Sequence, residues 1–411
     1  MPKPVERLTQ AEIAILDASE RLPASDAKHA AYAQLRQNGL PTRRVEAWHY
    51  TDLRNAIKHF PGFPQTHPKP VETKPRIGQF IPAVRIAFVD GKCAGFAALP
   101  AGVSVAGTGR AHVLRNDADA IGMLNALTGS QGVVLEIAGG VPAGAIELCH
   151  LITGESAVAL RHAISVGTSA SVVMIERHAG TDGIASQSNT ITSLDVGDYA
   201  RLVWVIVQEE GDDAIHLSQL NVTLGARTNL TILVLNAGGG LVRREINIAA
   251  KGEGSEISIR GVNLIGGKSH VDVTTALVHE APGATANEIF RNVVTGEGRG
   301  VFQGQIKVAQ AAQKTDAKMA CNTLLLSDSA EFFAKPELEI FADDVACGHG
   351  ATVTDIVDEH LFYLRARGIP QKPARAMLVQ AFVEEVFDDL EDEAMKDALN
   401  FRIEAWLVRH G

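Results

Sequence analysis

The sequence predicts a mainly β chain whose centre is a parallel β-helix, a type of β-solenoid, with α-helical segments at both ends. The main observation is a repeat of about 29 residues, because turn glycines recur at intervals of 30, 28, 29 and 29 residues. Short aliphatic runs follow the first four glycines and further runs lie midway, which gives two strands per repeat. Such a period is typical of stacked coils that bury their apolar faces on one another. A β-propeller fits less well, because its blades need about 40 residues. The glycines are Gly167, Gly197, Gly225, Gly254 and Gly283.

At 411 residues the chain is long for one compact unit, and its pattern divides it into three parts. Residues 1–80 form an N-terminal helical domain with a proline-rich linker at its end. Residues 81–354 form the β-helix core. Residues 355–411 form a C-terminal helical domain.

Helix signals mark the N-terminal domain. Thr9 and Glu12 have the spacing of a capping box, which predicts a helix over residues 11–21. A second helix is expected over residues 27–37, closed by Gly39.

Two segments separate these helices from the core. Residues 41–53 are dense in Arg, Trp, His, Tyr and Asp, which could indicate a binding surface. We favour an aromatic anchor that pins the helices to the core, since Trp and Tyr usually bury an apolar body. Residues 61–78 are rich in proline and are expected to be the linker.

Charged and polar side chains within the repeats could line a catalytic groove or form a solvated outer face. We favour the solvated face, because alternate strand residues face opposite ways. The histidines in the core show no recurring ligand spacing and are expected to be surface or hydrogen-bonded residues. The charged residues concerned are Glu209, Glu210, Asp212, Asp213, Arg243, Arg244 and Asp272, and the histidines are His162, His178, His216, His270 and His279.

The C-terminal domain begins with a helix predicted over residues 358–367, closed by Gly368 in a left-handed conformation. An apolar stripe at intervals of four residues follows from Leu378 to Leu390, and residues 384–397 carry eight acidic side chains. The domain could be a cap over the open end of the solenoid or an acidic docking face for a partner. Both interpretations stay open.

Cys347 and His349 are the close Cys/His pair that we single out. If their segment is extended, both side chains leave the same face, and both are competent iron ligands. Two ligands do not complete a site, so others would come from elsewhere or from another chain. The alternative is a buried thiol beside a turn histidine. The four cysteines are widely spaced with no C-x-x-C, so no complete four-cysteine cluster site is encoded.

The net charge of −10 and the pI of about 5.8 argue against a nucleic acid or an anionic membrane as partner. The first twenty residues contain no long apolar run, so no signal peptide is expected. These features predict a cytoplasmic protein with free thiols.

The stretch around Cys347 closely resembles the C-terminal region of the SufD family, subunits of the Suf iron–sulfur cluster assembly complex. The matching runs are KPELEI at 335–340, ADDV at 342–345, CGHGAT at 347–352, LFYLR at 361–365 and RGI at 367–369. The stretch RRVEAWHYTDL at 43–53 also matches the family in character, through the residues Arg43, Glu46, Trp48, Tyr50, Thr51, Asp52 and Leu53. The resemblance implies a right-handed parallel β-helix and a non-enzymatic scaffold.

The resemblance also implies partners. A SufB-like paralogue would pair through the β-helix, and a SufC-like ABC ATPase would dock on the C-terminal helices. The chain could form a homodimer when alone, and no cofactor would be bound stably, with iron or an iron–sulfur cluster present transiently. This chain has no G-x-x-x-x-G-K-[ST] phosphate loop, so ATP chemistry would belong to the ATPase. The implied docking residues are Leu361, Phe362, Tyr363, Leu364, Leu378, Phe382, Val386 and Leu390.

By the same resemblance, His349 takes part in cluster assembly at the interface with the paralogue, and Cys347 is a second candidate ligand. Gly348 stands where many relatives have serine. Cys321 is a possible supplementary thiol, although we favour a harmless substitution, because a free cysteine packs like a small apolar residue.

Two other function classes compete with this one. A polysaccharide-active β-helix enzyme is disfavoured because the repeats show no regular cluster of carboxylates or arginines. A filament-forming, bactofilin-like solenoid is disfavoured by the irregular flanking segments.

Overall fold

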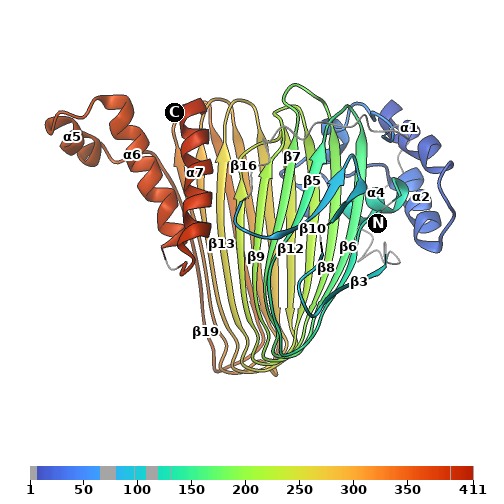
Figure 1. Ribbon diagram of the computed structural model, residues 1–411. Coiled ribbons are helices and arrows are strands. Elements are labelled where there is room, and N and C mark those ends of the chain that lie inside the picture. The colour runs from blue at the N-terminus through green and yellow to red at the C-terminus, as the bar shows by residue number, and fades with distance from the viewer. Residues whose placement is uncertain are drawn as a thin grey trace.

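The computed structural model describes residues 7–64, 80–96, 98–107, 119–129, 131–388 and 390–410 of the chain. A stack of strands runs between two groups of helices (Figure 1). This arrangement confirms the predicted mainly β class with helices at both ends. The predicted proline-rich linker lies outside the described residues except for residues 61–64, which form no helix or strand.

The strands of the described residues form two sheets. The ten-stranded sheet has the order β19-β17-β15-β13-β11-β9-β7-β5-β1-β2, and the nine-stranded sheet has the order β18-β16-β14-β12-β10-β8-β6-β4-β3. Their bounds are β1 Val84–Val89, β2 Lys92–Phe96, β3 Val103–Gly107, β4 Val134–Ile137, β5 Pro142–Ile152, β6 Ala157–Val166, β7 Ser171–Gly180, β8 Gln187–Val196, β9 Arg201–Glu209, β10 Ile215–Leu224, β11 Asn229–Asn236, β12 Leu241–Ala250, β13 Glu256–Ile265, β14 His270–His279, β15 Thr285–Val294, β16 Arg299–Val308, β17 Asp316–Leu325, β18 Glu331–Ile340 and β19 Ala346–Thr354.

From β4 onward, consecutive strands alternate between the two sheets, so each coil of the chain gives one strand to each sheet. This confirms the prediction of two strands per repeat. Within a sheet the neighbouring strands are parallel from one coil to the next: Trp204 pairs with Ile232, and Ile232 pairs with Ile259. Antiparallel pairs occur only where β2 joins β1 and β3 joins β4, at the N-terminal end of the described stack. The molecule is therefore a parallel β-solenoid and not a propeller.

One corner of each coil turns through a residue with a left-handed backbone. Its N–H donates to a carbonyl oxygen of the next coil at 2.7–3.0 Å, so hydrogen bonds connect successive corners along the stack. The corner residues that donate these hydrogen bonds are Ser169, Tyr199, Arg227, Gly254, Gly283 and Lys314, with φ between 54° and 75°.

The predicted turn glycines have two different structural roles. Gly254 and Gly283 occupy the left-handed position itself. Gly167, Gly197 and Gly225 lie two residues before it, at a point of close approach between coils. A Cβ at Gly197 would lie 2.8 Å from the backbone nitrogen of Thr168, so a larger residue there would push the coils apart.

Apolar side chains are buried in three places: in the interior between the two sheets and on the outer face of each sheet. In β9, Trp204 and Ile206 point into the interior between the sheets, whereas Val205 and Val207 point outward and are equally buried. Helices cover both outer faces, which is why these strands read as nearly continuous apolar runs.

The N-terminal helices cover the outer face of the nine-stranded sheet and pack on residues such as Ile191 and Leu217. The predicted capping box is confirmed, because Glu12 N–H donates to Thr9 Oγ1 at 3.2 Å and Thr9 N–H donates to Glu12 Oε2 at 2.6 Å. The helices are α1 Gln10–Ser19, α2 Asp26–Asn38, η1 Glu46–Trp48, α3 Leu53–Ala56 and α4 Ala120–Leu127, so the first two lie within two residues of their predicted bounds.

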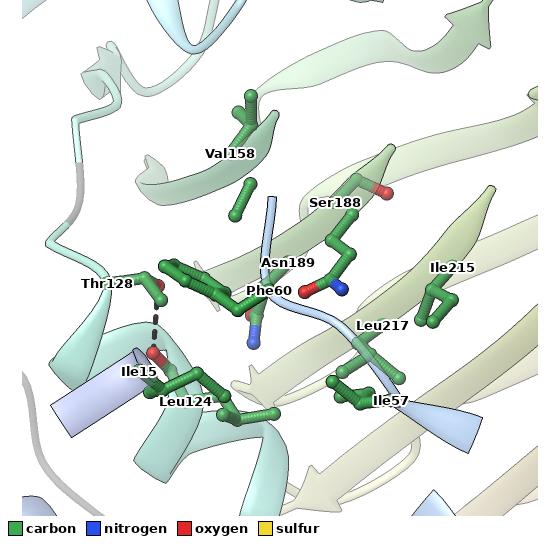
Figure 2. A pocket seen from close by; sticks show the side chains of 12 residues that line it. Ile15, Ile57, Phe60, Leu124, Thr128, Val158, Ser188, Asn189, Ile215 and Leu217 are labelled. Carbon is green, nitrogen blue, oxygen red and sulfur yellow. Dashed lines mark hydrogen bonds between the residues drawn. The ribbon is translucent and has the colours of Figure 1, made fainter. Parts of the chain in front are cut away.

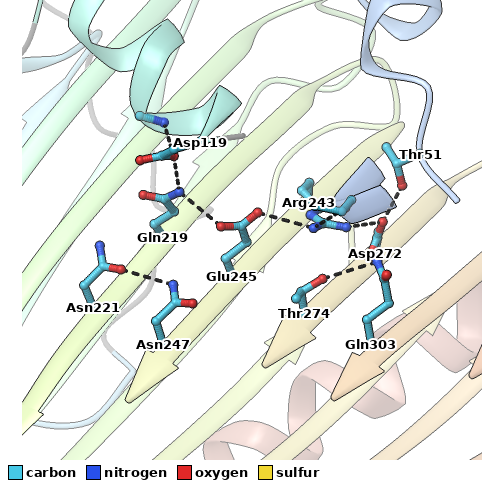
Figure 3. A network of polar contacts seen from close by, with 12 residues as sticks. Thr51, Asp119, Gln219, Asn221, Arg243, Glu245, Asn247, Asp272, Thr274 and Gln303 are labelled. Carbon is cyan, nitrogen blue, oxygen red and sulfur yellow. Dashed lines mark hydrogen bonds and ion pairs between the residues drawn. The ribbon is translucent and has the colours of Figure 1, made fainter. Parts of the chain in front are cut away.

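The aromatic stretch at residues 41–53 is an anchor, as predicted. The side chain of Trp48 is 1% exposed, and the guanidinium of Arg243 lies 4.8 Å from its ring centroid. Arg243 also donates to the carbonyl oxygen of Ala47 at 3.0 Å, and Thr51 donates to the carboxylate of Asp272. These contacts join the N-terminal helices to the core (Figure 3).

The prediction that the charged residues of the repeats form a solvated face is wrong for Glu210, Arg243, Arg244 and Asp272, which are buried. It is correct for Asp212 and Asp213, which are exposed, and Glu209 is half-buried. Arg243 and Asp272 form an ion pair on the outer face beneath the N-terminal helices. The error has a physical cause: strand alternation separates the two faces of a sheet but does not reveal that helices cover the outer one.

The C-terminal helices pack on the outer face of the ten-stranded sheet. Val379, Val383 and Phe387 belong to one apolar cluster with outward-facing residues of the sheet, such as Val207 and Leu235. The interpretation of these helices as a cap over the open end of the solenoid is therefore wrong. The helices are α5 Asp358–Ala366, α6 Gln371–Glu384, η2 Glu385–Phe387 and α7 Glu393–His410.

Candidate functional site

The last coil of the solenoid, formed by β18 and β19, lies at the end of both sheets. Neither strand has a further neighbour on its outer side among the described residues. Three large apolar side chains of this coil, Ile340, Phe341 and Val353, are exposed. An uncovered strand edge presents unpaired N–H and C=O groups, which other chains can pair with. This end of the stack is therefore open.

Cys347 and His349 lie on β19, at this open end. Cys347 pairs with Ala317 and His349 pairs with Met319, and both of these partners face the solenoid interior. The two side chains therefore share the inward face of the last strand, as expected for an extended segment. Cys347 is half-buried and His349 is exposed.

The environment of Cys347 favours the protonated thiol. Burial raises its pKa, and the nearby carboxylate of Asp316 adds to the rise, while a backbone hydrogen bond from Ala317 opposes it. The flanking glycines leave room around the pair, because a Cβ at Gly348 or Gly350 would meet no atom within 4 Å. The packing of this chain alone does not require glycine at either position.

Cys321 lies one coil inside the open end, on β17. It pairs with Ala351, so it is displaced by four residues along the strand from Cys347, or about 13 Å at 3.3 Å per residue. It is fully buried, and Asn292 Nδ2 donates to its sulfur at 3.3 Å. Burial raises the pKa of Cys321 to about 12. The structure therefore does not bring Cys321 together with Cys347.

In the part of the chain that the structure describes, Cys347 and His349 belong to no group of three His, Cys, Asp or Glu side chains placed to hold one metal ion. A thiolate and an imidazole supply two ligands of the four that zinc or an iron–sulfur cluster iron usually takes. Any metal at this pair needs ligands from another molecule.

The predicted docking residues lie in two places. The four on α5 belong to a helix with no buried residue, and Phe362 and Tyr363 are 73% and 56% exposed. Val386 is buried against the ten-stranded sheet, and Phe382 and Leu390 are half-buried beside it. Leu378 is also half-buried. The eight residues therefore fall into two groups: four on α5, of which two are exposed, and four between Leu378 and Leu390, three of which pack against the ten-stranded sheet.

Sequence reasoning missed a group of buried polar side chains inside the solenoid. His150, Glu176 and His178 each offer a ligand atom, and these atoms lie within 4.8 Å of one another. The signal was present, because His150 and His178 are one repeat apart and Glu176 shares a strand face with His178. The expectation that the core histidines are surface or hydrogen-bonded residues fails for His279, which is buried with both ring nitrogens unpartnered among the described residues.

The molecule also has a small cavity between the N-terminal helices and the nine-stranded sheet (Figure 2). Its volume is about 20 Å³, enough for one water molecule, and apolar side chains such as Ile57, Phe60 and Leu217 dominate its lining. This size and lining are those of a packing void and not of a substrate site.

No helix in the described residues is long and apolar enough to cross a membrane.

Comparison with known proteins gives a consistent result. Residues 150–382 match the family model described as "SUF system FeS cluster assembly, SufBD core domain". The chain is 30% identical over 391 residues to the iron–sulfur cluster assembly protein SufD of Escherichia coli, with 90% of each chain covered. It is 28% identical over 203 residues to a SufBD family protein of Synechocystis, covering 49% of this chain and 45% of the relative. It is 29% identical over 192 residues to SufD of Plasmodium falciparum, covering 46% of this chain and 13% of the relative.

The family match covers more than half of the chain, and the similarity to the Escherichia coli protein extends over nearly all of it. The SufD resemblance predicted from the sequence motifs is confirmed. The chain belongs to the SufBD family of the SUF iron–sulfur cluster assembly system.

Proposed function

We propose that this chain is a scaffold subunit in iron–sulfur cluster assembly, without catalysis of its own, and that a second solenoid chain of the SufB type completes its site. The observation that carries the proposal is the position of Cys347 and His349. They share one face of the last, uncovered strand and have no third ligand within the described chain. A site with two ligands at an open edge is suited to being shared between two chains.

The open end has the features of an interface. The edges of β18 and β19 offer a row of backbone groups to a partner strand. The exposed side chains of Ile340, Phe341 and Val353 add apolar area beside them. A paralogous solenoid presents a matching edge, so two such ends would bury each other and continue the stack. A second copy of this chain could do the same when the paralogue is absent.

The chemistry of the pair suits transient loading. The raised pKa of Cys347 keeps its thiol protonated near neutral pH, so binding iron or a cluster as thiolate releases a proton. The exposed imidazole of His349 is the more accessible ligand. Iron and the growing cluster are cargo of this site and not a resident cofactor of the chain.

The same proposal places an ABC-type ATPase on the C-terminal helices. The exposed aromatic side chains of Phe362 and Tyr363 on α5 are suited to a partner, because aromatic anchors often dominate binding energy. The chain itself lacks the phosphate-loop motif, so ATP hydrolysis belongs to that partner. Packing of α6 and α7 on the ten-stranded sheet would transmit movement of the ATPase to the solenoid. The complex would work in the cytoplasm.

The test is cluster assembly on the complex purified from the native cells through a tag on this chain. We expect His349→Ala to reduce bound iron and acid-labile sulfide at least about tenfold while the partners still co-purify. The matched control is His59→Ala, another exposed histidine, whose side chain is 73% exposed and far from β19 in the sequence. Cluster content equal to the wild type in His349→Ala would contradict the role of this residue. Activity of the purified chain on pectin-like polymers would overturn the scaffold assignment.

A further inference from the structure

The solenoid interior holds four histidine rings in contact with one another. The rings of His150 and His162 have centroids 5.1 Å apart, those of His150 and His178 are stacked at 4.5 Å, and those of His178 and His216 meet edge to face at 4.6 Å. All four side chains are buried. Most of the interior is filled by apolar side chains, and packing alone does not require a cluster of four imidazoles.

The register of the coils explains how these side chains meet. His150 on β5 pairs directly with His178 on β7. Glu176 lies two residues before His178 and therefore faces the same way, into the interior. His162 on β6 and His216 on β10 approach from the opposite sheet. Two strands of each sheet therefore contribute a histidine to the cluster.

The hydrogen bonds fix the tautomers on one side of this cluster. Val133 N–H donates to His162 Nδ1 at 3.2 Å, so the ring hydrogen of neutral His162 is on Nε2. His162 Nε2 lies 3.1 Å from His150 Nε2 and donates to it. The hydrogen of neutral His150 is then on Nδ1, which has no partner among the described residues. The histidine cluster alone leaves a buried donor unsatisfied, which is costly.

Two carboxylates and one guanidinium lie among these rings. Glu176 and Glu210 are buried carboxylates, and Arg244 is the guanidinium that interacts with both of them. His178 Nε2 bonds to Glu176 Oε1 at 2.9 Å, and His216 Nδ1 bonds to Glu210 Oε2 at 2.7 Å. Glu210 has a partner in His216, and Glu176 is the carboxylate that lies beside His178, where its charge would compensate a buried cation.

We propose that His150, Glu176 and His178 form a buried site for one divalent first-row transition metal ion. Two imidazole nitrogens and one carboxylate oxygen, with ligand atoms within 4.8 Å of one another, are the donor set that Zn²⁺ and Fe²⁺ take in proteins. The ion would replace the hydrogen between His178 Nε2 and Glu176 Oε1, and that hydrogen would move to His178 Nδ1. A pair of ligands on a tetrahedral ion, each at about 2.1 Å, lies a little over 3 Å apart, close to the present spacing.

The surroundings support this assignment. Trp204 Nε1 donates to Glu176 Oε2 at 3.2 Å, which orients the carboxylate and leaves its other oxygen for the ion. His150 holds its hydrogen on Nδ1, so it would ligate through Nε2, and the ion would take the place of the hydrogen bond from His162. Ligating residues are commonly held in place by outer hydrogen bonds of this kind.

This site is distinct from the open end and does not rest on the proposed function. In the ten-stranded sheet, β7 and β19 are separated by six strand spacings, or about 29 Å. Because it is enclosed, the ion would be acquired as the coils form, and its role would be to hold these turns together.

The first measurement is the metal content of the full-length chain after purification without chelator, by elemental analysis. We expect about one divalent ion per wild-type chain, retained in His279→Gln and His349→Ala, and reduced to about a tenth in Glu176→Gln and His178→Gln. His279→Gln is the matched control, because His279 is another buried interior histidine of the same solenoid. An ion retained in folded Glu176→Gln and His178→Gln would overturn the proposal, as would a wild-type chain without metal.

A second measurement covers variants that fail to fold. Wild-type crystals would be examined at the absorption edge of the metal found. An anomalous peak between His178 Nε2 and Glu176 Oε1 supports the site, and a peak only at Cys347 and His349, or none, overturns it.

Discussion

Glu288 gives the sharpest prediction about stability. Its carboxylate points into the solenoid interior from β15 and is 1% exposed, and the hydroxyl of Thr275 offsets only part of the effect of this burial. Burial raises the pKa of Glu288 from its ordinary value of 4.5 to about 7. The protonated form is the one that the interior accepts.

The sign of the effect on stability follows from linkage. Between about pH 4.5 and 7 the folded chain holds a proton that the unfolded chain has lost, so the free energy of unfolding falls as pH rises. The two pKa values differ by about 2.5, and at 1.36 kcal/mol for each pH unit the loss is about 3 kcal/mol above pH 7. Below pH 4.5 the group has no such effect.

Glu288→Gln keeps the shape of the protonated acid and removes the titration. We expect its unfolding free energy to match the wild type at pH 4.5 and to exceed it by up to about 3 kcal/mol at pH 8. The assay is urea unfolding of both proteins at several pH values, followed by circular dichroism. Glu297→Gln is the control, because Glu297 is exposed and pairs only loosely with Lys268 at 3.7 Å. If the difference in unfolding free energy between the wild type and Glu288→Gln is the same at pH 4.5 and pH 8, the reasoning is refuted.

Three further outcomes are expected. Trp48→Ala should lower the unfolding free energy by about 3–5 kcal/mol, because it empties the contact with Arg243 that anchors the N-terminal helices; thermal unfolding within a degree of the wild type would contradict this. Phe362→Ser with Tyr363→Ser should leave the melting temperature unchanged, since α5 buries nothing, yet weaken capture of the ATPase partner at least about tenfold in pull-down titrations; unchanged capture would place docking elsewhere. Cys321→Ser should retain cluster assembly, because Cys321 is buried about 13 Å along the strand from Cys347; loss of cluster content in a folded variant would make this thiol part of the site.

Most of the fold could be predicted from the sequence, because the repeat of a solenoid appears as a fixed period in the amino-acid sequence. The corners at Gly254 and Gly283 need a left-handed backbone, and those at Gly167 and Gly197 need room for the next coil. Both constraints favour glycine, so the single pattern of recurring glycines has two different structural causes. Ser169 and Tyr199 adopt the left-handed conformation without glycine, and no composition rule would have indicated them.

The surroundings of the strands were harder to foresee. Alternation along β12 shows that Arg243 and Arg244 face opposite ways, but both are buried, one beneath the N-terminal helices and one in the interior. Which helices cover which face depends on contacts between distant segments, such as Val383 with the ten-stranded sheet. Sequence spacing carries little information about such contacts.

The candidate site divides in the same way. Two residues apart on an extended segment, Cys347 and His349 could be placed on one face from sequence alone. The histidines of the interior could not, because the meeting of His150 with His178 depends on the register between coils. Only when the repeat is aligned at 28 residues does the pair become visible.

The central claim is that the open end carrying Cys347 and His349 is completed by a paralogous chain. The most direct measurement places a photo-crosslinking amino acid at Val353, an exposed position on β19, in the tagged chain within its native cells. The same probe at Asp213, an exposed position of the loop before β10, is the control. We expect Val353 to give one major adduct, identified by mass as a SufB-type chain, and Asp213 to give none with that partner. An adduct at Val353 with the ATPase, or no adduct in cells that contain the paralogue, would contradict the claim.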